Sequence, residues 1–88
     1  MSKSNPYVAN LVQQKRSLQD QVKRLRESKK MRAQSLSDSI KYCSDRSQKV
    51  NLRNQKTASN ESFDSQIQSV RYQIASVTSQ ISSARRSR

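Results

Sequence analysis

Residues 63–84, FDSQIQSVRYQIASVTSQISSA, contain the clearest periodic pattern in this chain. Apolar residues follow one another there at alternating spacings of four and three, with mostly polar residues between them. They are Phe63, Ile67, Val70, Ile74, Val77, Ile81 and Ala84. A β-strand would place apolar residues at every second position, whereas this spacing puts them on one stripe of an α-helix. The pattern predicts a helix over residues 61–84 whose narrow apolar stripe, the seam, packs against another helix.

A shorter seam of the same kind lies near the other end of the chain. Its residues also follow steps of three and four, apart from one position that Lys15 occupies; they are Val8, Leu11, Leu18, Val22 and Leu25. Asn5 and Pro6 precede them. Asn caps the free amides of a helix, and Pro at the first helical position loses no hydrogen bond. We therefore predict a short flexible segment over residues 1–5 and a first helix over residues 6–43.

Residues 44–60, between the two seams, are harder to interpret. Apolar residues keep only a loose helical spacing around this region, and charged or polar residues occupy several seam positions. The stretches 44–47 and 57–60 are rich in side chains that compete for backbone hydrogen bonds, although neither contains Gly or Pro. We predict a polar turn region or helix break here, with Asn60 or Ser59 as a cap for the second helix.

The two seams fit an antiparallel hairpin. If the chain folds back on itself, facing residues have a constant sum of positions, and Leu11 with Ile81 and Val22 with Val70 share one sum. The centre of this register falls at residue 46, inside the first of the two polar stretches. The alternative is one long helix that pairs with a copy of itself. Its seam would need a discontinuity, because the two seams differ in phase, so we favour the hairpin.

Composition favours an all-α protein. The 88 residues include no Gly and a single Pro, and tight hairpin turns and phosphate-binding loops usually need Gly. Apolar residues make up 31% of the chain, below the usual share of roughly 45–50%, so disorder is the competing interpretation. A narrow seam offsets little of the conformational entropy of so long a chain. We expect an all-α protein, a long antiparallel helical hairpin or coiled coil, that forms part of an oligomeric or hetero-helical bundle.

Enzymes and metalloproteins need residues that this sequence does not offer. The chain has no His and no suitably spaced pair of carboxylates, so we predict no catalytic residue, no metal site, no cofactor and no enzyme. The single cysteine, Cys43, forms no internal disulfide. No apolar run reaches the roughly 18 residues of a membrane span, and the N-terminus lacks the apolar core of a signal peptide. We expect a soluble protein without a cleavable signal peptide, and a reducing compartment is slightly favoured.

The formal net charge of +12 is unevenly distributed. Cations cluster over residues 23–32 and in a basic tail at residues 85–88, whereas residues 57–84 contain only Arg71. The clustered cations are Lys23, Arg24, Arg26, Lys29, Lys30, Arg32, Arg85, Arg86 and Arg88. They predict contact with a polyanion, either nucleic acid or an acidic partner. No aromatic residues are interleaved for base stacking, and no zinc-finger spacing is present.

Our first functional hypothesis is a non-enzymatic interaction or assembly protein, either an adaptor or a structural component. Its seam would pack against a second copy or a helical partner, while its basic surface docks an acidic partner. The predicted helix–helix interface consists of Val8, Leu11, Leu18, Val22, Leu25, Phe63, Ile67, Val70, Ile74, Val77 and Ile81. A second hypothesis is a small basic protein that binds or packages nucleic acid.

A third hypothesis is a small secreted helical-hairpin partner of a specialised secretion system. In size, helicity and Ser and Gln content the chain is loosely like the short helical-hairpin proteins of such systems. The Trp-x-Gly turn of the best-known family of this kind is impossible here, because the chain contains neither Trp nor Gly. The likeness is therefore one of architecture and indicates no particular family.

Overall fold

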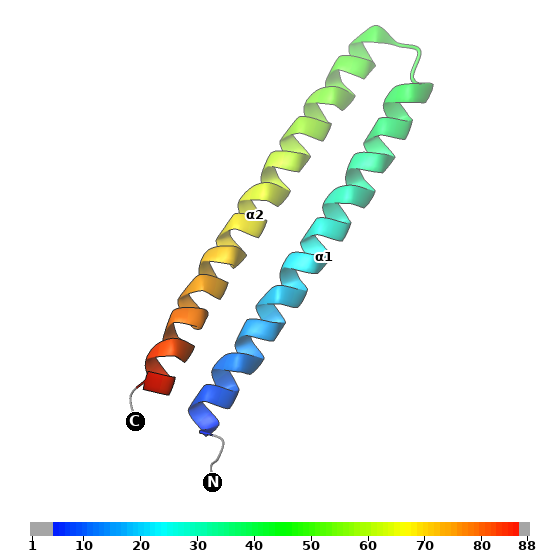
Figure 1. Cartoon of the computed structure of the whole chain (residues 1–88). Coiled ribbons are helices and arrows are strands. Elements are labelled where there is room, and N and C mark those ends of the chain that lie inside the picture. Colours follow the sequence, from blue (N-terminus) through cyan, green and yellow to red (C-terminus); the bar gives the residue numbers. More distant parts are fainter. Residues whose placement is uncertain (1–4, 87–88) are drawn as a thin grey trace.

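The computed structural model describes residues 5–86 as two long helices that fold back on each other (Figure 1). The first helix, α1, spans Pro6–Tyr42. Its start matches the sequence pattern: the Asn5 side chain accepts a hydrogen bond from the Tyr7 backbone N–H at 2.9 Å. Pro6 follows in the first turn. The cap thus satisfies one of the backbone amides that the first turn of a helix leaves without an intrahelical partner.

The turn consists of Cys43, Ser44 and Asp45. Cys43 ends α1 with an extended backbone, φ −88° and ψ 126°, and its N–H donates to the Ile40 carbonyl at 3.3 Å. The Asp45 carboxylate then accepts a hydrogen bond from the Ser47 backbone N–H at 3.0 Å, which caps the start of the next helix. No described residue has a positive φ, so this reversal needs no glycine.

The second helix, α2, spans Arg46–Arg86 and begins earlier than the sequence predicts. Residues 46–60, expected to be part of a polar turn region or break, are helical, so neither Asn60 nor Ser59 caps the helix. Their polar side chains remove the apolar period that reports a helix, but a segment without Gly or Pro keeps its helical propensity. The reversal lies at the first of the two polar stretches, close to the position that the antiparallel register predicts.

The helices pack through two small apolar clusters near the chain ends. One cluster joins α1 to α2 through Leu11, Val77 and Ile81, and the other does so through Val22, Ile67 and Val70. The predicted partners Leu11 and Ile81 therefore meet, as do Val22 and Val70. We call residues 5–25 and 67–86 the terminal half of the hairpin and residues 26–66 the turn half. In the turn half only Leu36 is buried.

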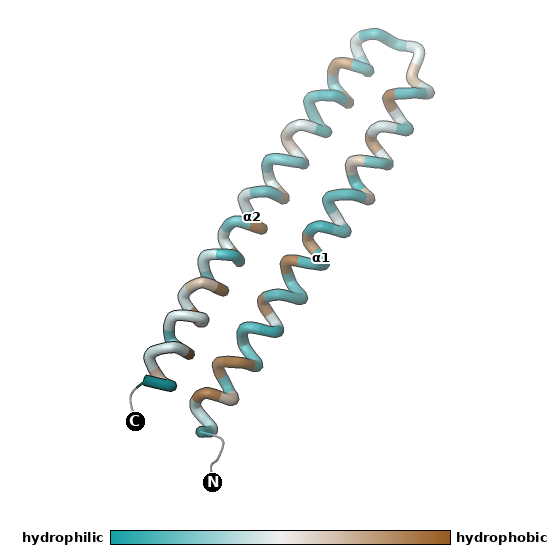
Figure 2. The backbone as a smooth tube through the Cα atoms, in the orientation of Figure 1, coloured by the Kyte–Doolittle hydropathy of each residue, from teal (hydrophilic) through white to brown (hydrophobic). Residues whose placement is uncertain are grey.

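The molecule is a rod with extents of 68 × 17 × 11 Å. This arrangement confirms the predicted all-α helical hairpin and excludes the single continuous helix. In Figure 2 long stretches of α2 near the turn are hydrophilic, whereas hydrophobic segments recur on both helices toward the chain ends. The predicted flexible segment at residues 1–5 and basic tail at 85–88 lie mostly outside the described residues, and α2 continues through Arg86. Neither helix within residues 5–86 has an apolar run that would let it cross a membrane.

Candidate interaction surfaces

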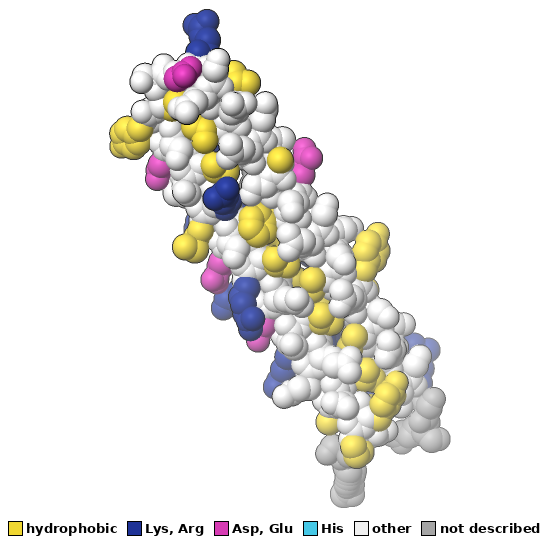
Figure 3. All heavy atoms as spheres, turned by 180° about the vertical axis from the view of Figure 1, so that it is seen from behind, with side chains coloured by type: hydrophobic (Ala, Val, Ile, Leu, Met, Phe, Trp, Pro, Cys, Tyr) yellow, Lys and Arg dark blue, Asp and Glu magenta, His cyan; other side chains and the backbone are white. Residues whose placement is uncertain are grey.

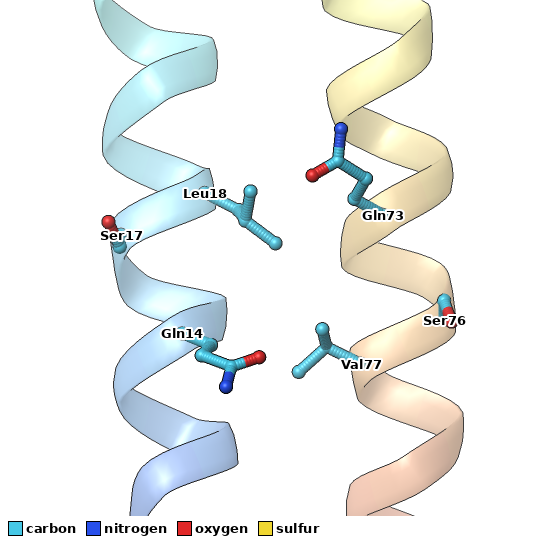
Figure 4. A pocket seen from close by; sticks show the side chains of 6 residues that line it. All are labelled: Gln14, Ser17, Leu18, Gln73, Ser76 and Val77. Carbon is cyan, nitrogen blue, oxygen red and sulfur yellow. The ribbon is translucent and has the colours of Figure 1, made fainter.

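Of the residues predicted for the helix–helix interface, all except Phe63 belong to the two apolar clusters that join α1 and α2. None of the predicted residues is exposed. Those that are only half-buried are Val8, Leu18, Leu25, Phe63 and Ile74. In Figure 4 the side chains of Leu18 and Val77 point toward each other from the two helices. A hairpin of two helices covers its seam from two sides only, so the flanks of the seam remain accessible.

In the turn half the seam is partly cationic. Lys49 and Lys56 lie fourteen and seven residues before Phe63, in the same row of α2, and both are half-buried. Lys29 of α1 is half-buried as well. Long cationic side chains can cover a seam with their aliphatic stems while the ammonium group stays in water. Our sequence interpretation missed Lys49 and Lys56, although extending the row of Phe63 backward by sevens would have found them.

One ion pair crosses the hairpin within residues 5–86. Lys29 Nζ donates to Asp64 Oδ1 at 2.6 Å, and the two side chains are 33% and 60% exposed. The antiparallel register places Lys29 opposite Phe63, the residue next to Asp64. Exposed pairs of this kind contribute about 0–1 kcal/mol. Lys49 and Lys56 make no salt bridge with another described residue.

A groove beside these cations opens between the helices near the turn. It has a volume of about 490 Å³ and is lined by Ser37, Ile40, Arg53, Lys56, Thr57 and Asn60. We call it the cationic groove. Its lining combines two cations, several hydrogen-bond donors and one apolar side chain, and it contains no carboxylate. This set of groups suits a carboxylate or phosphate oxygen, because guanidinium and hydroxyl groups donate to anions.

A second groove lies in the terminal half and carries no charge. It has a volume of about 340 Å³ and is lined by Gln14, Ser17, Leu18, Gln73, Ser76 and Val77 (Figure 4). We call it the neutral groove. In Figure 4 Gln14 lies across from Val77, and Gln73 lies across from Leu18, on the facing helix. The groove therefore offers amide donors and acceptors around an accessible piece of the seam.

The two grooves open on opposite faces of the hairpin. Each residue turns an α-helix by about 100°, so residues before and after a seam residue lie on opposite sides of it. On α1, Ser17 immediately precedes a seam residue, whereas Ser37 immediately follows one. On α2, Ser76 likewise precedes a seam residue and Thr57 follows one. The neutral groove thus lies on the side of the preceding residues, and the cationic groove lies on the side of the following ones.

Along both helices the residues before the seam positions are mostly uncharged, whereas many of the residues after them are charged. On α2 the residues that precede successive seam residues are Gln66, Ser69, Gln73, Ser76, Gln80 and Ser83. Cations that follow a seam residue are Arg16, Lys23, Arg26, Lys30, Lys41, Arg53, Arg71 and Arg85, and Glu61 and Asp64 share their side. We call the two sides the neutral face and the cationic face. Figure 3, seen from behind, shows the neutral face, which is mostly white around its yellow seam near the chain ends.

The cations predicted to contact a polyanion do not form one patch. Lys23, Arg26 and Lys30 are exposed on the cationic face, but Arg24 precedes a seam residue and so lies on the other side. Arg32 is exposed, and Lys29 is held by Asp64. Arg85 and Arg86 lie at the end of α2, beside the start of α1 (Figure 1). Arg88 lies outside the described residues.

Cys43 is half-buried in the turn. Its Sγ lies 3.4 Å from the Asp45 carbonyl oxygen and 3.6 Å from Gln48 Oε1, contacts that help to close the turn. Among residues 5–86, no group of three or more potential ligands is placed to hold a metal ion. Comparison with protein-family models, with curated proteins and with solved structures finds no match to this chain.

Proposed function

We propose that this protein is a non-enzymatic interaction protein whose hairpin docks an acidic helical partner along the cationic groove. The observation that carries the proposal is the pair of half-buried lysines, Lys49 and Lys56, on the seam of the turn half without an acidic partner. Cations at a helix–helix seam weaken the hairpin itself, since they replace apolar contacts. A partner helix that brings carboxylates to these lysines would restore the stability that the hairpin lacks at this part of the seam.

The composition of the groove defines the partner. Ile40 offers an apolar contact, and Arg53 and Lys56 lie beside it. An amphipathic helix with a narrow apolar stripe, flanked by Glu or Asp, matches both features. Its stripe would cover the seam of the turn half, where Leu36 alone is buried, and its carboxylates would accept hydrogen bonds from Arg53. The hairpin and its partner would then form a bundle of three helices.

The proposal is tested with a labelled helical peptide that carries Leu at seam positions and Glu at the flanking positions. Binding to the full chain is measured by fluorescence polarisation over a range of salt concentrations. We expect saturable binding that weakens with salt, and an Arg53→Gln, Lys56→Gln variant that binds about tenfold more weakly.

The matched control is Arg24→Gln, Arg32→Gln, which removes the same net charge from exposed positions outside the cationic groove. It should change the affinity less than the groove variant does. Equal losses in both variants would mean that only the overall charge attracts the peptide. No binding at low salt would reject the proposal.

Nucleic acid is a second candidate partner, favoured by a different feature. Arg16, Lys23 and Lys30 form an exposed row at intervals of seven residues on the cationic face. At 1.5 Å per residue the row spans roughly 21 Å of α1, which is long enough to contact several phosphates of one strand.

A salt titration with a labelled DNA duplex separates the two candidates. If this row contacts phosphates, the Lys23→Gln, Lys30→Gln variant should have a slope of log K against log salt concentration that is smaller in magnitude by about two. Its binding of the acidic peptide should be nearly unchanged. If the duplex binds no better than the acidic peptide at any salt concentration, this second candidate is rejected.

A further inference from the structure

A second, separate surface of the hairpin has a different composition. On the neutral face of the terminal half, Gln and Ser alternate beside the seam of α2. On α1 the matching positions are Asn10, Gln14, Ser17 and Gln21, and this uncharged run ends at Arg24. All of these Asn, Gln and Ser side chains are exposed, whereas the seam residues beside them are buried or half-buried. The face is therefore a polar but uncharged border on both sides of a strip that is apolar except at the half-buried Lys15.

We infer that this neutral face is the contact surface for a second copy of the chain. Each copy carries a formal charge of +12, so two copies that met through their cationic faces would bring rows of like charges together. The neutral face of the terminal half lets two seams approach with less repulsion, because Lys15 is the one seam cation in residues 5–25 and 67–86. This inference concerns another surface than the proposed docking groove and does not depend on an acidic partner.

The chemistry of the face is complementary to itself. A glutamine amide both donates and accepts hydrogen bonds, so Gln14 and Gln73 of one copy can pair with the same residues of a second copy across a two-fold axis. Between them, Leu18 and Ile74 are only half-buried in the single hairpin and would be covered by the second copy. Two hairpins joined in this way form a four-helix bundle, and small helical proteins often gain stability by such association.

The oligomeric state of the full chain tests the inference. Sedimentation equilibrium should give twice the chain mass of 10.1 kDa for the unmodified protein at high concentration. In a Gln14→Lys, Gln73→Lys variant, four added cations per pair of copies meet at the contact, and we expect the chain mass alone. The control, Gln19→Lys, Gln68→Lys, adds the same charge at exposed positions away from the neutral groove and should still give the doubled mass.

A charge-reversal experiment keeps the test decisive if the lysine variant loses helical structure for another reason. Gln14→Glu, Gln73→Glu should also sediment with the chain mass alone, because its added charges repel as well. An equimolar mixture of the Glu and Lys variants should recover the doubled mass, since opposite charges then meet. The inference is overturned if the unmodified chain has only its own mass at every concentration, or if the mixture recovers no association.

Discussion

The terminal half and the turn half of this hairpin use the same helical geometry with different seams. In the terminal half, Leu11 and Val22 of α1 contact buried Ile and Val residues of α2. In the turn half, Lys49 and Lys56 occupy the same row of α2, and only Leu36 is buried. The fold is therefore held together mainly at the end where the chain starts and finishes.

This difference assigns distinct roles to the two ends. Burying an apolar side chain contributes about 1.5–3 kcal/mol, so the terminal half supplies most of the free energy that opposes unfolding. The turn half contributes little of that free energy and carries the groove with uncompensated cations. Its helices are joined by a turn of three residues, which holds them close despite the weak seam. A surface that binds a partner can be less stable by itself, because the partner completes it.

The largest expected effect comes from placing a charge in the terminal seam. Val70 is 6% exposed within its cluster, and a Val70→Asp substitution buries an unpaired carboxylate. The cost of several kcal/mol is comparable with the whole free energy of unfolding of a small domain. We expect the helical circular dichroism signal to be lost at low concentration. Ser65→Asp, an exposed position on the same helix, should keep it; an intact spectrum for Val70→Asp would contradict the packing described here.

A smaller effect, of opposite sign, is expected from making the turn seam resemble the terminal one. Lys49→Leu, Lys56→Leu should raise the free energy of unfolding by about 1–3 kcal/mol, since both side chains are half-buried. The same variant should bind the acidic peptide more weakly. Thermal denaturation gives the first result, and Lys30→Leu, Lys41→Leu is the control at exposed positions. A lower melting temperature for the seam variant would show that the lysine stems already pack better than Leu.

The same contrast explains what could be predicted from the sequence. The run from Phe63 to Ala84 predicts a helix and a seam, and with Leu11 and Val22 it predicts the antiparallel register. Residues 46–60 have no apolar period, so their helical structure is imposed by the flanking helix and the absence of a residue that would end it. The sequence already contains the difference in charge between the residues before and after each seam position. The neutral and cationic faces can be recognised only when both helices are placed, because each face combines residues of α1 and α2.

The caps at the two ends of the hairpin should have similar, moderate effects. Asn5 accepts from the Tyr7 N–H at the start of α1, and Asp45 accepts from the Ser47 N–H at the start of α2. Replacing either by Ala should lower the free energy of unfolding by about 1 kcal/mol. Native-state hydrogen exchange should separate them: Asp45→Ala is expected to speed exchange mainly in residues 46–56. Equal acceleration along the whole of α2 would mean that the turn half does not open independently.

The smallest effect is expected from the ion pair between Lys29 and Asp64, which lies in the turn half. Both side chains are partly exposed, so water and salt screen their attraction, and the coupling free energy should be about 0.2–1 kcal/mol. A double-mutant cycle with Lys29→Gln and Asp64→Asn measures it by chemical denaturation, and the coupling should fall further at high salt. Lys29 also continues the seam of α1, so Lys29→Leu is expected to stabilise the hairpin more than the pair does. If the coupling instead exceeded that gain, charge pairing would be a main source of stability in the turn half, and the contrast between the two seams would be smaller than their burial indicates.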